Sequence, residues 1–267
     1  MDLQLAGKRA IVTGGSRGIG KAIARALAEE GVDVALVARN PEPLEAAAAE
    51  IVEATGQRVV AVPADTGEDA SVRAMVERAV AELGGVDILV NCAAQPGGQG
   101  GVPSLDEIDA ETHFWPDMNV KVMGYLRCAQ AVAPHMKAAG WGRIINVSGL
   151  AARQSGSTIG SMRNVAVAAM TKNLADELGP HGVNVTVVHP GLTRTEATAG
   201  VVARRAEATG ATPEDVERRM AENNTIRRLI DAEDIAYVVT MLASPRSIAI
   251  TGDTIAAGGG APRAIHY

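Results

Sequence analysis

The sequence is poor in aromatic residues, since only six of its 267 residues are Phe, Trp or Tyr. Such a chain lacks the stacked aromatic surface on which proteins bind single-stranded nucleic acid. Positive charge is in deficit, because 31 Asp and Glu outnumber 25 Lys and Arg and give a formal net charge of −6. This balance disfavours a polyanionic partner. We therefore expect no nucleic acid among the partners.

Cysteine and long apolar runs are also scarce. The two cysteines, Cys92 and Cys128, cannot form a disulfide framework, which favours a reducing compartment. No apolar run reaches the roughly 18 residues of a membrane-spanning helix. Residues 1–5 have neither the basic nor the apolar region of a signal peptide, and we find no metal-ligand spacing. These absences predict a cytoplasmic protein without a metal site or a membrane partner.

Short apolar runs alternate with longer segments of helical periodicity, and 47% of the residues are hydrophobic. The runs are continuous in Val and Ile rather than alternating with polar residues, which indicates strands covered on both faces. Alternation of strands and helices predicts parallel βαβ units. We predict strands at 9–13, 33–38, 58–63, 86–91, 143–148, 183–189 and 250–257, and helices at 19–30, 43–55, 69–83, 118–139, 161–178 and 231–242.

Residues 192–225 differ from the rest of the chain, because they contain five Arg and six Asp or Glu and no strand signal. One interpretation is a pair of solvated surface helices. The other is a mobile lid over a pocket, because the segment follows the sixth strand at the edge of the sheet where ligands bind.

A glycine-rich turn follows the first predicted strand. Its residues, Thr13-Gly14-Gly15-Ser16-Arg17-Gly18-Ile19-Gly20, lie directly between that strand and a predicted helix. In this context such a turn indicates a dinucleotide site rather than a turn without ligand. Gly14 permits the tight turn, Gly18 lets the backbone approach a phosphate, and Gly20 lets the helix pack on the strand. The helix N-terminus then faces a diphosphate.

This turn resembles the cofactor fingerprint of the classical short-chain dehydrogenase/reductase family. Further motifs of that family occur along nearly the whole chain. At the end of the fourth predicted strand, Asn91-Cys92-Ala93-Ala94 resembles the family's Asn-Asn-Ala-Gly turn, with two departures. The other matches are Ala64-Asp65, Asn119, Ile145-Asn146-Val147-Ser148, Pro190-Gly191-Leu192-Thr193-Arg194-Thr195, Glu233-Asp234-Ile235-Ala236 and Thr251-Gly252.

The resemblance implies an α/β fold: one Rossmann domain over residues 1–267, a doubly wound parallel sheet of about seven strands with helices on both faces, and a substrate lid at about 192–225. It also implies a set of cofactor-binding positions in this chain. These are Gly14, Ser16, Arg17, Gly18, Ile19, Gly20, Arg39, Asp65, Asn91, Ala93, Pro190, Gly191 and Thr193.

The end of the second predicted strand favours NADP(H) over NAD(H). NAD-preferring members of the family place an acidic residue there to hold the ribose hydroxyls, whereas this chain has Ala38 and Arg39. Arg17 lies in the glycine turn. Two guanidinium groups suit a 2′-phosphate through charge-assisted, bidentate hydrogen bonds. The alternative is that Arg39 stacks on adenine or faces solvent.

The catalytic pair of the family is missing. The family uses a tyrosine and, four residues later, a lysine whose charge lowers the tyrosine pKa from about 10, so that the phenol exchanges a proton during hydride transfer. Here those positions fall on Gly160 and Asn164. No tyrosine occurs between positions 125 and 237 and no lysine between positions 137 and 172, so no shift of alignment restores the pair.

Four residues are the predicted catalytic set. Ser148 matches the active-site serine, although Gly149 is an alternative for that position, and Asn119 matches the asparagine of the proton relay. His189 is the best-placed titratable group, because the sixth strand ends beside the nicotinamide; the alternative is a structural, hydrogen-bonded histidine. Asn164 can bond the ribose but supplies no charge.

We weigh three functions. The first is an atypical NADP(H)-dependent oxidoreductase that transfers a hydride to or from a small carbonyl, alcohol or conjugated C=C substrate. The second is a non-redox enzyme on the same scaffold: a dehydratase, lyase, isomerase or cyclase. The third is a catalytically silent nucleotide-binding protein. The complete cofactor half favours the first. Helices at 118–139 and 161–178 correspond to those that pair across a twofold axis in this family, so we also expect a homodimer or homotetramer.

Overall fold

The computed structural model describes residues 2–94 and 102–262. Its main sheet has seven parallel strands in the order β3-β2-β1-β4-β5-β6-β9. The order reverses between β1 and β4, which opens a crevice at the carboxyl ends of these strands. The strands are β1 (Arg9–Thr13), β2 (Asp33–Ala38), β3 (Val59–Pro63), β4 (Ile88–Asn91), β5 (Gly142–Val147), β6 (Val183–Pro190) and β9 (Thr254–Ala257).

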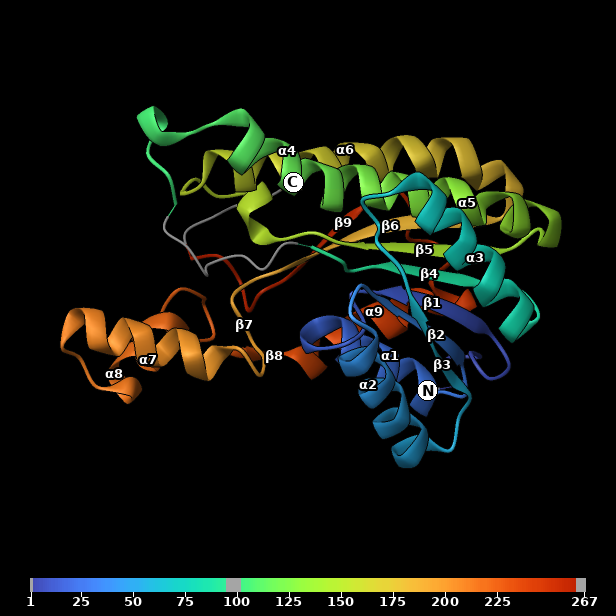
Figure 1. Cartoon of the computed structure of the whole chain (residues 1–267), viewed down its shortest axis with the longest axis horizontal. Helices are drawn as coiled ribbons and strands as arrows, with labels where there is room; N and C mark the ends of the chain where they lie inside the picture. Colours follow the sequence, from blue (N-terminus) through green and yellow to red (C-terminus); the bar gives the residue numbers. More distant parts are fainter. Residues whose placement is uncertain (1, 95–101, 263–267) are drawn as a thin grey trace.

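Helices cover both faces of this sheet, as the apolar strand runs predict (Figure 1). On one face, α1, α2 and α9 pack over a core formed with β1 and β2. On the other, α3, α5 and α6 pack over a second core. The helices are α1 (Gly18–Glu29), α2 (Pro41–Thr55), α3 (Asp69–Leu83), α5 (Gly124–Ala139), α6 (Thr158–Leu178) and α9 (Ala232–Ala243).

The helix predicted at 118–139 is longer and less regular than its sequence pattern indicates. It starts with a π-helical turn at Ala110–Phe114, continues as α4 (Trp115–Met118), and passes through a second π-helical turn at Asn119–Met123 before α5. A π-helical turn inserts an extra residue and rotates the side chains that follow. The helix predicted at 118–139 is therefore confirmed in extent, although residues 119–123 are π-helical, which the sequence pattern did not indicate.

The segment 192–225 forms two helices, α7 (Thr198–Thr209) and α8 (Pro213–Ala221), which project from the body of the molecule (Figure 1). They enclose a small core of their own around Val202, Val216 and Met220. The expectation of no strand was wrong at Thr193–Arg194 (β7), which pairs with Ile230–Asp231 (β8). The predicted strand at 250–257 keeps only its last four residues.

Within residues 2–94 and 102–262, no helix has both the length and the apolar content needed to cross a membrane. In the same ranges, no three His, Cys, Asp or Glu side chains are arranged to hold a metal ion.

Candidate active site

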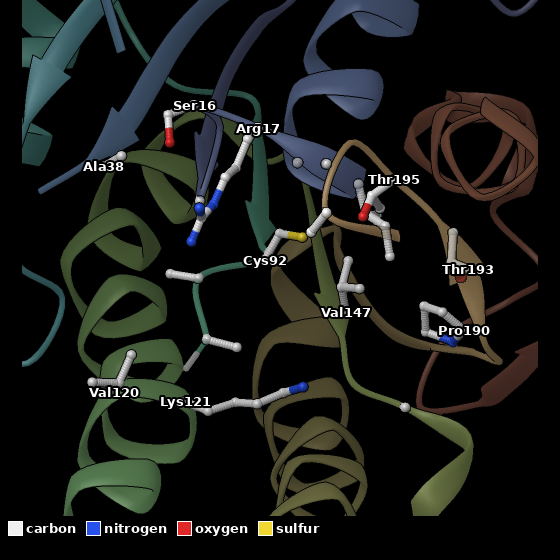
Figure 2. A pocket seen from close by; sticks show the side chains of 18 of the residues that line it. Ser16, Arg17, Ala38, Cys92, Val120, Lys121, Val147, Pro190, Thr193 and Thr195 are labelled. Atoms are coloured by element: carbon white, nitrogen blue, oxygen red, sulfur yellow. The ribbon is translucent and has the colours of Figure 1, made fainter. Parts of the chain in front are cut away.

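A cavity of about 910 Å³ lies at the carboxyl ends of the central strands. Its walls come from the turn after β1, the ends of β2 and β5, the segment after β4, the π-helical turn before α5, the start of α6, and the segment after β6. Figure 2 shows Ser16 and Arg17 at one end and Lys121 at the other. This shape suits an elongated ligand that runs across the switch point of the sheet.

The glycine turn at one end of the cavity is built for close backbone packing. Gly14 has a φ of +71°, in the left-handed region that favours glycine. A Cβ at Gly20 would lie 2.3 Å from the Gly14 carbonyl oxygen, so no side chain fits there. Helix α1 begins at Gly18 without a side-chain cap. Its first N–H groups therefore face the cavity as an anion site.

An acidic side chain from the segment before α7 already contacts this anion site. The Glu196 carboxylate accepts hydrogen bonds from the Gly18 N–H, at 3.0 Å and 3.3 Å to its two oxygens. Sequence reasoning missed Glu196, because 178 residues separate the two partners along the chain.

The end of β2 contributes Ala38, Arg39 and Asn40 to the cavity wall, and the glycine turn contributes Arg17. No acidic residue lies at the position that would hold ribose hydroxyls. Among the described residues, neither Arg17 nor Arg39 is in an ion pair with an acidic side chain. Both guanidinium groups can therefore bind an anionic ligand.

A hydroxyl fixes the segment after β4 beside the glycine turn. Thr13 Oγ1 accepts hydrogen bonds from the N–H groups of Cys92 (3.0 Å) and Ala93 (3.2 Å). The Cys92 side chain lies in the cavity wall (Figure 2). Burial raises its thiol pKa to about 11, so the thiol is neutral at pH 7 and is no activated nucleophile.

The cavity brings together twelve of the thirteen predicted cofactor-binding residues. The exception is Asn91, which is buried in the sheet. Its Nδ2 donates to Asn146 Oδ1 at 2.9 Å, and Asn146 Nδ2 donates to Thr171 Oγ1 at 2.9 Å. Asn91 thus links β4 to β5 and, through Asn146, to α6.

Two of the four predicted catalytic residues meet in the cavity. Ser148 Oγ donates to the side-chain oxygen of Asn164 at 3.1 Å, and both residues line the cavity. Asn164, on α6, is the residue that the sequence predicts at the position of the family's lysine. Gly160, which the sequence predicts at the position of the family's tyrosine, is not among the described residues that line the cavity.

The other two predicted catalytic residues, Asn119 and His189, are not among the residues that line it. The Asn119 side chain donates to the Gly67 oxygen and accepts from Arg127. His189 is 1% exposed, and its Nδ1 accepts from the Gly149 N–H at 3.3 Å. Burial and the nearby Arg153 and Lys121 lower its pKa to about 4, so its ring is neutral at pH 7.

Sequence reasoning missed Lys121. This lysine follows Asn119 by two residues, and it lines the cavity, where its Nζ donates to the backbone oxygen of Ser148 at 3.0 Å. Figure 2 shows Lys121 at the end away from Ser16 and Arg17. The family's lysine lies on the helix after the fifth strand, whereas Lys121 lies in the π-helical turn before α5. The nearest signal was its place beside a family motif, Met118-Asn119-Val120.

The chain is similar to known proteins over nearly its whole length. Residues 8–206 match the family model for short chain dehydrogenases. The chain is 39% identical over 254 residues to the short-chain reductase protein NovJ of Streptomyces niveus, covering 95% of this chain and 93% of that protein. It is 36% identical over 264 residues to the oxidoreductase UcpA of Escherichia coli K12, covering 96% and 95%.

The fold is also that of a solved reductase. The crystal structure of L-sorbose reductase from Gluconobacter frateurii, complexed with NADPH and L-sorbose, matches with a TM-score of 0.91 and 30% identity, covering 99% of this chain and 100% of that one. The chain therefore belongs to the short-chain dehydrogenase family. It is an oxidoreductase of that family with a site for a nicotinamide dinucleotide.

Proposed function

We propose that the protein is an NADP(H)-dependent oxidoreductase that transfers a hydride to or from a small carbonyl, alcohol or conjugated C=C substrate without the usual tyrosine and lysine. One observation carries the proposal: a single cavity joins the anion site at Gly18 to the Ser148 and Asn164 side chains. A bound dinucleotide supplies the hydride chemistry at its nicotinamide ring. The protein binds and orients the dinucleotide and the substrate, and it excludes water from the reacting atoms.

The charge at the end of β2 supports NADP(H) as the cofactor. Arg17 and Arg39 would hold a 2′-phosphate by charge-assisted hydrogen bonds. An acidic residue in place of Ala38 would repel that phosphate. Gly14, Ser16, Gly18, Ile19 and Gly20 would hold the diphosphate, and the remaining cofactor contacts would come from Asp65, Ala93, Pro190, Gly191 and Thr193.

Ser148 and Asn164 would orient the substrate. The Ser148 hydroxyl donates to Asn164 in this structure, and rotation about its C–O bond would let it donate to a substrate oxygen. Asn119 and His189 would act by position, because their hydrogen bonds fix the turn before α5 and the backbone at Gly149.

Residues 192–225 would form a lid. Glu196, Val201, Arg205 and Met220 from this segment line the cavity, and Glu196 contacts the glycine turn at Gly18. Movement of α7 and α8 would therefore open and close the cavity to substrate and cofactor.

Two further expectations belong to this proposal. Met162 and Val165 are exposed apolar residues of α6, which favours the expected pairing of helices in a homodimer or homotetramer. Cys92 and Cys128 are both free thiols, which agrees with the cytoplasmic location expected from the sequence.

The test combines binding with turnover. NADPH fluorescence should change on titration with the protein, and a panel of ketones, quinones and enones should contain substrates that oxidise NADPH. A protein that binds NADPH yet oxidises it with no member of the panel would contradict the proposal. The alternative, suggested by the missing tyrosine, is a non-redox enzyme. Such an enzyme would convert a substrate without consuming NADPH, and Ser148→Ala would abolish that conversion.

A further inference from the structure

Lys121 is a buried cation at the reaction end of the cavity, and neither the family pattern nor the proposed function has so far given it a role. We propose that Lys121 is a catalytic residue that exchanges a proton with the substrate oxygen, in place of the absent tyrosine. This inference rests on the proposed function and names the proton donor of that same site.

The position of the amine supports this role. Lys121 is 4% exposed and lines the cavity together with Ser148 and Asn164. Its Nζ donates to the backbone oxygen of Ser148 at 3.0 Å. The amine therefore lies beside the residue that would orient the substrate. Figure 2 shows it at the end opposite Ser16 and Arg17, where the diphosphate and 2′-phosphate would bind.

The Lys121 ammonium has N–H donors available for a ligand. Among the described residues, Nζ makes only the hydrogen bond to Ser148. An ammonium group has three N–H donors, so two are available to a molecule in the cavity. A buried donor without a partner is unfavourable, and a substrate oxygen would satisfy it.

Charged and titratable groups from four elements surround the amine. Arg163 on α6 disfavours its charged form, whereas Asp117 on α4 favours that form. The Cys92 thiol after β4 is neutral at pH 7 and adds no charge there. His189 on β6 is neutral at pH 7. Asp117 is itself paired with Arg163, at 2.6 Å and 2.7 Å from Nη1 to its two oxygens. Because their opposite charges offset each other, the ion pair of Asp117 and Arg163 shifts the Lys121 pKa less than either charge alone would.

Burial is the largest effect on the amine, and it lowers the Lys121 pKa from 10.5 to about 7. A group of this pKa carries and releases a proton with similar ease at neutral pH, which is the requirement for an acid and base in reversible hydride transfer. Arginine at the same place would not meet it, because a guanidinium does not release its proton.

The proposed step couples a hydride transfer to a proton transfer. The carbonyl carbon accepts a hydride from the reduced nicotinamide, the carbonyl π bond breaks, and the substrate oxygen takes a proton from the Lys121 ammonium. The products are an alcohol, the oxidised nicotinamide and a neutral amine. Water then protonates the amine. In the reverse direction the neutral amine removes the hydroxyl proton as the hydride leaves.

The first test measures the pKa of the Lys121 amine and its protection by NADPH, and it requires no turnover. Pulse acylation of the cofactor-free protein from pH 5.5 to 9.5, with mass spectrometry of the peptides, gives the labelling rate of each lysine. Lys121 should reach half of its maximal rate near pH 7, and saturating NADPH should slow its labelling at least tenfold. Exposed Lys172 on α6 is the internal reference and should be labelled equally with and without NADPH. No rise in Lys121 labelling below pH 9 would overturn the proposal.

The second test uses carbonyl reduction by wild type, Lys121→Met, Lys121→Arg and the control Lys172→Met. Loss of general acid catalysis predicts a fall in kcat of about 10²–10⁴-fold for Lys121→Met, with the NADPH Kd changed less than about threefold. The wild-type rate should fall as pH rises through about 7, because the ammonium is the donor. Lys121→Arg should lack this fall, and Lys172→Met should behave as wild type.

The outcomes separate the two proposals. If wild type turns over and Lys121→Met keeps its rate and pH profile, the role of Lys121 is overturned and the proposed function stands. If wild type binds NADPH but oxidises it with no carbonyl, the proposed function fails and the role of Lys121 fails with it. Circular dichroism checks folding, and Lys121→Gln replaces the Met variant if that variant does not fold.

Discussion

The carboxylate of Glu196, in the segment before α7, accepts a hydrogen bond at 3.0 Å from the backbone N–H of Gly18, the first residue of α1. A negative charge is thus bound where the helix dipole and free N–H groups favour an anion. The proposed diphosphate site and the proposed lid are joined by this contact. A diphosphate bound at Gly18, as proposed, would therefore require the Glu196 carboxylate to move away.

This contact predicts that Glu196→Gln binds NADPH more tightly. The neutral amide is a weaker acceptor and does not repel a diphosphate, so the affinity should rise about threefold to tenfold, or on the order of 1 kcal/mol. Fluorescence titration measures it. Glu207→Gln, an exposed acid on α7, is the matched control and should leave the affinity unchanged. An equal Kd for wild type and Glu196→Gln would show that the contact does not compete.

The arginine at the end of β2 predicts cofactor choice. Arg39→Ala should weaken NADPH binding by about 10- to 100-fold through loss of a charge-assisted pair, and should change NADH binding by less than about threefold. Calorimetric titration with both coenzymes gives the ratio. Arg25→Ala, on the exposed side of α1, controls for loss of one positive charge. Equal losses for both coenzymes would contradict a 2′-phosphate site at Arg39.

Burial of His189 predicts an acid-sensitive fold. Its folded pKa of about 4 lies below the 6.5 of an unfolded histidine, so the unfolded chain binds a proton that the folded chain does not. Stability from this residue is present above pH 6.5 and is lost as pH falls towards 4. Between pH 7 and pH 5 the loss should be about 2 kcal/mol. Urea unfolding at both pH values measures it, and His189→Gln should show a smaller difference.

The hydrogen bond between the buried amides of Asn91 and Asn146 predicts that Asn91→Ala destabilises the fold. Asn91→Ala removes the donor to Asn146 Oδ1 and leaves that oxygen buried without its partner, which costs about 1–3 kcal/mol of unfolding free energy. The NADPH Kd of the folded variant should change little, because Asn91 is not among the cavity-lining residues. Asn173→Ala, at an exposed site on α6, is the control. A large loss of affinity with unchanged stability would restore the direct cofactor contact predicted from the sequence.

The exposed apolar surface of α6 predicts an interface between copies of the chain. Val165→Arg places a charge in the expected contact and should shift the protein towards monomer. Light scattering coupled to gel filtration reports the mass. Met241→Arg, which changes an exposed apolar residue on α9, should leave the mass unchanged. A monomeric wild type would remove the expectation of a homo-oligomer.

The order of strands and helices was readable from the sequence, because a buried parallel strand and an amphipathic helix have different apolar periods. The predicted bounds of β1, β2 and α3 are those observed. The π-helical turns at 110–114 and 119–123 were not readable, since no residue period distinguishes them from an α-helix. The start of the last strand was misjudged because an apolar run does not show where strand pairing begins.

The cofactor end of the site follows from the sequence, and the catalytic end does not. The glycine turn is contiguous, and its residues would meet a dinucleotide through their own backbone, so their order in the chain nearly defines their geometry. The position of His189 in the sequence, at the end of β6, did not show which way its side chain points. Successive residues of a strand point to opposite faces, and Pro190 lines the cavity whereas His189 does not.

The sequence by itself determined the family, the parallel sheet and the place of the glycine turn between β1 and α1, because each depends on residues close together in the chain. Only the tertiary structure decided that Lys121 enters the cavity beside Ser148 and that Glu196 lies on Gly18. These contacts join distant segments. They depend on how helices are rotated and packed against the sheet, which local periodicity does not specify.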